Sequence, residues 1–285
     1  MRPTEPKAIW LDVNGVRVHC LTSGESGIPV VFLHGGGVDS ATLSWSEIIG
    51  RVASRHQVFA PDLPGYGQSE RPDIQYTMEF YVQFVQHLLE GLNLKKVGLV
   101  GLSLGGAIAL SLTLDAPELV EKLILVDTYG IQDNVVSHRL SYLYVHLRGL
   151  AEMSSWLMSK SRAMVRRVLL ASLIYNPTHL SEELVNQCYQ AAREKGAGKA
   201  FLSLQRSEVR WHGVRSNFIL RLPNVTVPTL LVHGAEDRSV PLACAKRAHA
   251  LIARSQLHIM QECRHWPQRE NPDEFSRVVG NFLED

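Results

Sequence analysis

One serine in the sequence stands in a setting that suits nucleophilic chemistry. Ser103 is flanked by Gly101 and Gly105, with a run of small and β-branched residues before it and good helix formers after it. The pattern predicts a strand, a very tight turn and a helix, because only glycine leaves room for a backbone folded so closely. Such a turn presents the serine hydroxyl at the end of a sheet, in front of a helix N-terminus. The alternative is an ordinary turn in which Ser103 caps the helix.

A second glycine-rich turn offers hydrogen-bond donors. The apolar residues 30–33 predict a strand buried on both faces, and His34, Gly35, Gly36 and Gly37 follow it directly. Successive glycines let the backbone turn sharply and leave N–H groups free to bind a developing negative charge. The alternative is a flexible loop without a chemical role.

Two further turns supply an acid and a base. Asp237 follows the apolar strand expected at 229–233, and His265 follows the strand expected at 256–260. A serine hydroxyl needs a base to take its proton during attack, and imidazole is suited to that task near neutral pH. A carboxylate would hold the imidazole in one tautomer and stabilise its charged form. Asp127 also follows a strand and is the rival for the acid.

The elements that must position these groups alternate between strands and helices. An Asn-Gly pair at 14–15, between alternating apolar runs, predicts an opening hairpin. The later strands are expected at 30–33, 58–60, 97–101, 123–127, 229–233 and 256–260, and the helices at about 43–53, 77–92, 107–114, 241–253 and 273–283. This order predicts an α/β fold, a mostly parallel sheet with helices on both faces, whose functional groups follow the strands' carboxyl ends.

The alternation stops between residues 130 and 222, where only helical periodicity remains. We therefore expect a helical insertion, or lid, at 130–222 within a core formed by 1–129 and 223–285. The apolar residues expected to share one helical face are Leu147, Leu150, Leu157, Met164 and Val168. A second set could line an acyl pocket or form plain core: Met153, Trp156, Leu157, Met158 and Met164.

Lys and Arg outnumber Asp and Glu in this helical segment. The excess of positive charge could steer an anionic substrate or contact a membrane surface. The simpler interpretation is a set of solvated helix faces.

Composition and charge exclude several classes of protein. The chain has 285 residues, of which 45% are hydrophobic, and a formal net charge of +1, so nothing indicates a nucleic-acid partner. No apolar run approaches the ~20 residues of a membrane span, and the N-terminal residues lack the apolar centre of a signal peptide. The four cysteines are scattered, which predicts reduced thiols in a cytoplasmic protein and argues against a metal site.

Five motifs, each after an expected strand, together resemble the α/β-hydrolase family. They are Leu33 to Gly37, Pro61 to Ser69, Gly101 to Gly106, His233 to Asp237, and His265-Trp266. The resemblance covers essentially the whole chain and implies an eight-stranded, mostly parallel sheet with helices on both faces and a helical cap over 130–222.

The resemblance also implies the roles of individual residues. Ser103, Asp237 and His265 would form the catalytic triad, the backbone N–H groups of Gly36 and Leu104 the oxyanion hole, and Gly37 and Trp266 would contact the substrate. His34 and Asp62 would have structural roles, and His233 would be packed at the end of its strand. No cofactor or metal is implied, and because related hydrolases commonly assemble, a homodimer is one expectation.

A serine nucleophile argues against those family members that attack through a carboxylate. We expect a carboxylesterase-like hydrolase that cleaves small or medium esters through an acyl-enzyme. The alternative is a hydrolase of the meta-cleavage product type, which cuts a C–C bond in a ring-fission dienoate. The stretches His34–Gly37 and His265–Gln268 resemble that group. A non-catalytic small-molecule receptor on the same fold is a third hypothesis, against which the complete triad counts.

Several positions depart from the meta-cleavage group. Leu102 and Leu104 stand where that group usually carries Asn and Met, and Arg264 replaces a glycine before the histidine. The group's cap arginine has no clear counterpart, because Arg193 is nearest by position and Cys188 stands where the arginine is expected. These departures are the reason for placing the ester first.

Overall fold

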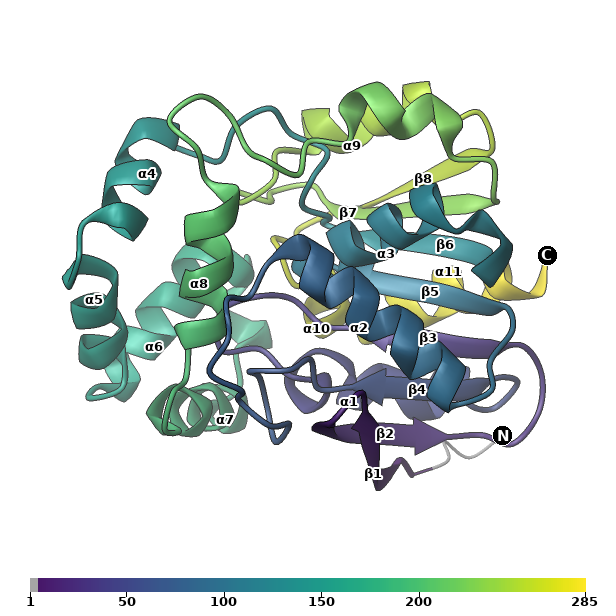
Figure 1. The fold of residues 1–285 in the computed structure, drawn as a ribbon, viewed down its shortest axis with the longest axis horizontal. Helices are drawn as coiled ribbons and strands as arrows, with labels where there is room; N and C mark the ends of the chain where they lie inside the picture. The colour runs from purple at the N-terminus through teal and green to yellow at the C-terminus, as the bar shows by residue number, and fades with distance from the viewer. Residues whose placement is uncertain (1–4) are drawn as a thin grey trace.

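The computed structural model describes residues 5–285, and Figure 1 shows a central sheet between two layers of helices with a further group of helices at one end. The sheet has eight strands in the order β1-β2-β4-β3-β5-β6-β7-β8. Strand β2 pairs antiparallel with β1 and β4, and all other neighbours pair in parallel. The strands are β1 (Lys7–Val13), β2 (Val16–Ser23), β3 (Pro29–Leu33), β4 (Gln57–Pro61), β5 (Val97–Leu102), β6 (Val120–Val126), β7 (Thr229–Gly234) and β8 (Ser255–Met260). The predicted α/β fold with a mostly parallel sheet is confirmed.

The opening hairpin forms as the sequence predicts. Val13 pairs with Val16, so the turn between β1 and β2 consists of Asn14 and Gly15 alone. Both have positive φ, 52° and 80°, which is the backbone that a two-residue hairpin turn requires.

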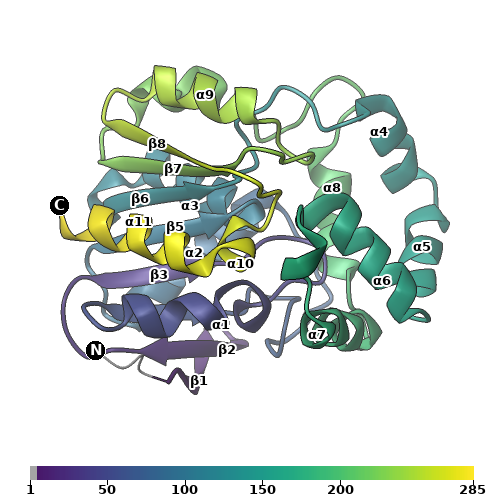
Figure 2. The ribbon, with the colours of Figure 1, turned by 180° about the vertical axis from the view of Figure 1, so that it is seen from behind.

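The central strands send alternate side chains into two layers of core. In β5, Leu99 packs with one layer and Val100 with the other. The first layer also contains residues of α2 (Met78–Gly91), α3 (Leu104–Asp115) and α9 (Leu242–Leu251), and the second contains residues of α1 (Ala41–Val52) and α11 (Pro272–Glu284). Figures 1 and 2 show α2 and α3 on one face of the sheet and α1 and α11 on the other. Continuous apolar runs are therefore needed in these strands, because both faces are covered.

The chain between β6 and β7 is helical, as expected, and lies at the carboxyl end of the parallel strands (Figure 1). Its helices are α4 (His138–His146), α5 (Leu150–Met158), α6 (Arg162–Val168), α7 (Glu182–Arg193) and α8 (Lys199–Glu208). Helices α6 and α7 join the core layer of α1, and α8 joins the layer of α2. The boundaries 1–129, 130–222 and 223–285 stay a prediction.

The expectation of one continuous apolar face in this segment is wrong. Leu147, Leu150, Leu157 and Met164 lie on or beside three separate helices and are 53%, 38%, 45% and 38% exposed. Gly149 lies between α4 and α5, and the polar residues 159–161 lie between α5 and α6. Each helix therefore points its apolar side chains in its own direction, whereas a single helical period assumes one continuous helix. Met153 and Trp156 are also exposed, so they belong to neither a core nor an enclosed pocket.

The lengths of the helices and the state of the cysteines bear on where the protein can reside. No helix in residues 5–285 combines the length and apolar character needed to cross a membrane. The four cysteines, Cys20, Cys188, Cys244 and Cys263, carry free thiols. Residues 1–4, which bear on the expectation about a signal peptide, lie outside the described part.

Candidate active site

Ser103 lies in a strained turn between β5 and α3. Its φ and ψ are 49° and −109°, and its side chain makes no capping hydrogen bond to α3. An L-residue in such a conformation costs of order 1–3 kcal/mol and persists only where the surroundings hold it. The interpretation of Ser103 as an ordinary helix cap is therefore wrong.

The glycines beside Ser103 are required by close backbone approach. A Cβ at Gly101 would lie 2.3 Å from the carbonyl oxygen of Gly105, and a Cβ at Gly105 would lie 2.2 Å from that of Leu33. The Ser103 N–H donates to the Val126 carbonyl at 2.9 Å, and the Tyr129 N–H donates to the Ser103 carbonyl at 3.1 Å. The end of β6 and the loop that follows it thus hold the serine backbone at the carboxyl edge of the sheet.

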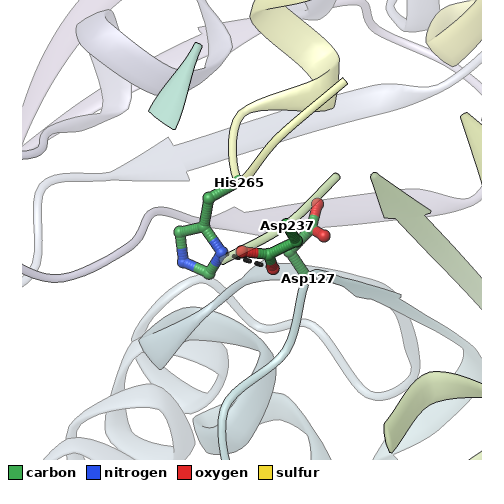
Figure 3. A group of neighbouring side chains, drawn as sticks. All are labelled: Asp127, Asp237 and His265. Atoms are coloured by element: carbon green, nitrogen blue, oxygen red, sulfur yellow. Dashed lines mark hydrogen bonds and ion pairs between the residues drawn. The ribbon is translucent and has the colours of Figure 1, made fainter. Parts of the chain in front are cut away.

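His265 and Asp237 meet at the same edge, from the turns after β8 and β7 (Figure 3). Nδ1 of His265 lies 2.8 Å from Oδ2 of Asp237, and both residues are buried. The Ser239 N–H donates to Oδ1 of Asp237 at 2.7 Å. Burial alone would raise the pKa of Asp237, but His265, its hydrogen bond and His233 together hold that pKa below the usual value. Asp237 is therefore ionised and oriented toward the imidazole.

Asp127, the rival acid, lies beside this pair without bonding to His265. Its Oδ1 accepts from the Gly234 N–H at 3.0 Å, and its other carboxyl oxygen, Oδ2, is buried with no hydrogen-bond partner within residues 5–285. Burial first, and then the charge of Asp237, raise the pKa of Asp127 well above its usual value. The raised pKa of Asp127 favours its protonated form beside the charged Asp237.

Asp127, Asp237 and His265 each offer one atom within 4.8 Å of the others, a spacing that a metal ion could bridge. The chemistry of these donors fits a metal poorly. Nδ1 of His265 is already hydrogen-bonded with Asp237, and the raised pKa of Asp127 disfavours the ionised carboxylate that a metal would need. The cluster fits an oriented imidazole better than a metal centre.

Ser103 and His265 are not joined by a hydrogen bond among the residues described. Catalytic hydrogen bonds are often long before substrate binds, so geometry without substrate does not exclude this pair. The topology brings both residues to one edge of the sheet, since Ser103 directly follows β5 and His265 follows β8.

The glycine-rich turn is shaped by the residues around it. A Cβ at Gly36 would lie 2.3 Å from the ring of Phe201 on α8. The Gly35 N–H donates to Asp39 at 2.8 Å, whereas the N–H groups of Gly36 and Leu104 have no protein acceptor in the described chain. Two free backbone donors at this edge of the sheet are what an oxyanion hole needs.

Three residues expected to have structural roles have them. His34 is buried, and its Nε2 accepts from the Leu63 N–H at 3.0 Å. The Asp62 carboxylate accepts from the backbone N–H groups of Ala41 and Gln68, at 2.7 and 2.9 Å. His233 is buried, and its Nε2–H donates to the Val240 carbonyl at 2.8 Å.

The other predicted substrate contacts lie apart from one another. Trp266 is 5% exposed, and its backbone N–H donates to the Leu173 carbonyl at 3.1 Å. Gly37 borders a cavity of about 310 Å³ between the glycine-rich turn, the loop after β4 and helix α7. None of Ser103, Asp237 and His265 lines that cavity.

Two residues beside the histidine have roles that the sequence did not indicate. The Arg264 guanidinium donates to the carbonyls of Leu170 and Ile174, the latter at 3.1 Å. The buried Glu270 accepts from the N–H groups of Tyr175 and Arg264 at 2.7 and 2.6 Å. Together they fasten the turn after α6 to the loop that carries His265. The sign of this contact in the sequence was Arg264 itself, which replaces the glycine found before the histidine in the meta-cleavage group.

Comparison with known proteins identifies relatives along nearly the whole chain. A family model described as alpha/beta hydrolase fold matches residues 28–272. A 2-hydroxymuconate semialdehyde hydrolase of Pseudomonas sp. (strain CF600) is 32% identical, over 94% of this chain and 91% of its own. A 2-hydroxy-6-oxo-2,4-heptadienoate hydrolase of Pseudomonas putida is 31% identical, over 90% of each chain.

Solved structures agree with this match. A meta-cleavage product hydrolase from Pseudomonas fluorescens IP01 has a TM-score of 0.82 and 28% identity, over 97% of each chain. The similarity extends through the helices between β6 and β7, because so little of either chain is left uncovered.

Proposed function

Since this chain belongs to the α/β-hydrolase family, and is a hydrolase like its relatives, we propose that it cleaves the C–C bond of a meta-cleavage dienoate. The observation that carries the proposal is the similarity, over nine-tenths of the chain, to relatives named for such substrates. The ester, which the sequence placed first, becomes the second candidate.

In the proposed mechanism Ser103 is the nucleophile. Its Oγ attacks the carbonyl carbon beside the scissile bond while Nε2 of His265 takes the hydroxyl proton. Asp237, 2.8 Å from the other ring nitrogen, holds the tautomer that leaves Nε2 free and stabilises the imidazolium. The N–H groups of Gly36 and Leu104 bind the oxyanion, and each such donor contributes about 2.7–4 kcal/mol.

Bond cleavage then uses the proton held by His265. The electron pair of the breaking C–C bond passes into the conjugated keto acid, and the departing carbon takes the proton. Ser103 is left acylated. Water, deprotonated by His265, attacks the acyl group and releases a carboxylic acid with the free serine.

We propose that the helical segment 130–222 acts as a cap over this site. Phe201 of α8 contacts the glycine-rich turn, and the Leu173 carbonyl accepts from Trp266 next to the histidine. Gly37 and Trp266 stay proposed substrate contacts. The free thiols support a cytoplasmic location, and a homodimer stays a prediction.

One observation favours the ester as second candidate. A dienoate carries a carboxylate, and Cys188, which stands where the cap arginine is expected, offers it no cation. Cys188 is buried, and burial raises the pKa of its thiol to about 12. The Arg193 guanidinium lies over the Tyr189 ring, 5.4 Å from its centre.

A substrate panel tests the order of the two candidates. The rate of clearance of a coloured ring-fission dienoate is compared with the hydrolysis of p-nitrophenyl acetate and butyrate. The proposal expects a kcat/KM for the dienoate at least about 100-fold above that for either ester, a difference of about 2.7 kcal/mol in barrier. Fast ester turnover with an untouched dienoate would reverse the order.

A further inference from the structure

Helices α4 and α5 expose apolar side chains where a surface helix normally presents polar ones. Leu140, Leu143 and Leu147 follow one another at steps of three and four along α4 and its end, and are 70%, 40% and 53% exposed. A similar spacing, two steps of three, recurs in α5, where Leu150, Met153 and Trp156 are all exposed. We call these six residues the outer face.

The inner sides of the two helices account for little burial. Val145 of α4 and Ala151 of α5 are buried, but neither belongs to the two main core layers. In Figures 1 and 2, α4 and α5 form the margin of the molecule farthest from the sheet. Large apolar side chains gathered on the exposed sides of two consecutive helices are a feature of interaction sites in folded proteins.

Positive charge predominates in the segment that carries the outer face. Residues 134–180 contain six Lys or Arg and one acid, Glu152. Glu152 is paired with Arg206 at 2.7 Å, and Arg162 and Arg166 are paired with Glu182. Arg139, Arg148, Lys160 and Arg167 have no carboxylate partner in the part of the chain that is described.

The aromatic and cationic side chains are arranged as at a membrane interface. Nζ of Lys160 lies 5.6 Å from the ring centre of Trp156, which is 57% exposed. Tryptophan prefers the boundary between headgroups and acyl chains, and lysine extends its ammonium toward the phosphates. Leucine and tryptophan flanked by Lys and Arg form the pattern of helices that lie in such an interface.

We propose that the outer face of α4 and α5 docks on an anionic lipid surface. The apolar side chains enter the headgroup boundary, and the four unpaired cations bind lipid phosphates. A second copy of the chain fits less well, because a two-fold contact would bring these cations against themselves without acids to pair them. The proposal does not depend on the reaction. It would turn the end of the molecule that carries Ser103 and His265 toward the membrane.

Flotation of the full chain with vesicles tests the proposal. Vesicles of phosphatidylcholine with phosphatidylglycerol are compared with pure phosphatidylcholine, at about 0.05 M and 0.5 M salt. We expect binding to the anionic vesicles that falls at high salt. The double variant Leu147→Ser/Trp156→Ser should bind at least tenfold more weakly, and so should Arg148→Glu/Lys160→Glu.

Leu220→Ser is the matched control. Leu220 is 93% exposed but lies on the turn Ile219–Asn224 near α9, so its variant should bind within twofold of the wild type. Circular dichroism checks that each variant is folded. Absence of wild-type binding at low salt, or equal binding by all variants, would overturn the proposal. So would a dimer, seen by sedimentation velocity without vesicles, that Leu147→Ser/Trp156→Ser dissociates.

Discussion

The carboxyl edge of the sheet and the outer face of α4 and α5 differ in which side chains they bury and which they expose. At the sheet edge, polar side chains are buried, and Asp237 is held by hydrogen bonds with His265 and Ser239. On the outer face, apolar groups such as Leu140 and Trp156 are exposed and touch little. Both arrangements cost free energy on folding, because buried charge and exposed apolar surface are both unfavourable. Neither arrangement stabilises the fold, as expected of regions whose side chains serve binding.

The largest effect is expected from the two acids at the sheet edge. Asp237→Asn removes the charge that orients His265 and should lower kcat/KM about 10⁴-fold. Asp127→Asn should lower it less than about tenfold, because the raised pKa of Asp127 favours its neutral form and Asp127 bonds to Gly234 rather than to His265. Steady-state kinetics of both variants measures the difference. Equal losses would mean that the two carboxylates act as one unit.

Truncating a leucine of the core layer and a leucine of the outer face should change the stability by very different amounts. Leu110 of α3 is fully buried, and Leu110→Ala should lower the free energy of unfolding by about 2–5 kcal/mol. Leu140→Ala, at 70% exposure, should change it by less than about 0.5 kcal/mol. Urea denaturation measures both. A large loss at Leu140 would show that the outer face supports the fold.

Gly36→Ala probes the glycine-rich turn. The added Cβ would lie 2.3 Å from the Phe201 ring, so the turn and its N–H must move. A displacement of that size should lower kcat about 100-fold. Gly280→Ala in α11, where the new Cβ meets nothing within 4 Å, is the control and should keep full activity. If Gly36→Ala is as active as the control, the donor lies elsewhere.

The smallest effect is a pH-dependent change in stability at Asp127. Its folded pKa is raised, so the folded state binds a proton that the unfolded state releases above its ordinary pKa of about 4. The stabilisation that this proton provides is full at low pH and is lost as pH rises through the folded value. Asp127→Asn should therefore raise Tm at pH 7 by about 2–4 °C and leave it unchanged near pH 3.5. An unchanged Tm at pH 7 would mean that Asp127 is not a neutral acid there.

Prediction from sequence succeeded where local chemistry fixes the backbone. The glycines around Ser103 and the Asn14-Gly15 turn admit few other conformations, and the apolar strands 30–33 and 229–233 have to be buried on both faces. The turns that carry Asp237 and His265 meet because β7 and β8 are parallel neighbours. The alternation of elements predicted a mostly parallel sheet, and the family resemblance implied the pair.

Prediction failed where the partner of a side chain lies far along the chain. Leu147 and Leu150 have the period of a buried face, but nothing in the sequence says whether another element covers it. Arg264 could not be assigned either, because its acceptors, Leu170 and Ile174, belong to a turn about ninety residues earlier. Its position before His265 showed that the chain departs from the meta-cleavage group there, but not which residues Arg264 contacts.

The most direct test of the proposed chemistry is the clearance of a ring-fission dienoate by Ser103→Ala beside the wild type, followed by the loss of the substrate's absorbance. The proposed mechanism predicts rapid clearance by the wild type and a rate at least about 10⁴-fold lower for the variant, with an unchanged Tm. A variant that keeps more than about a tenth of the wild-type rate would contradict the assignment of Ser103 as the nucleophile.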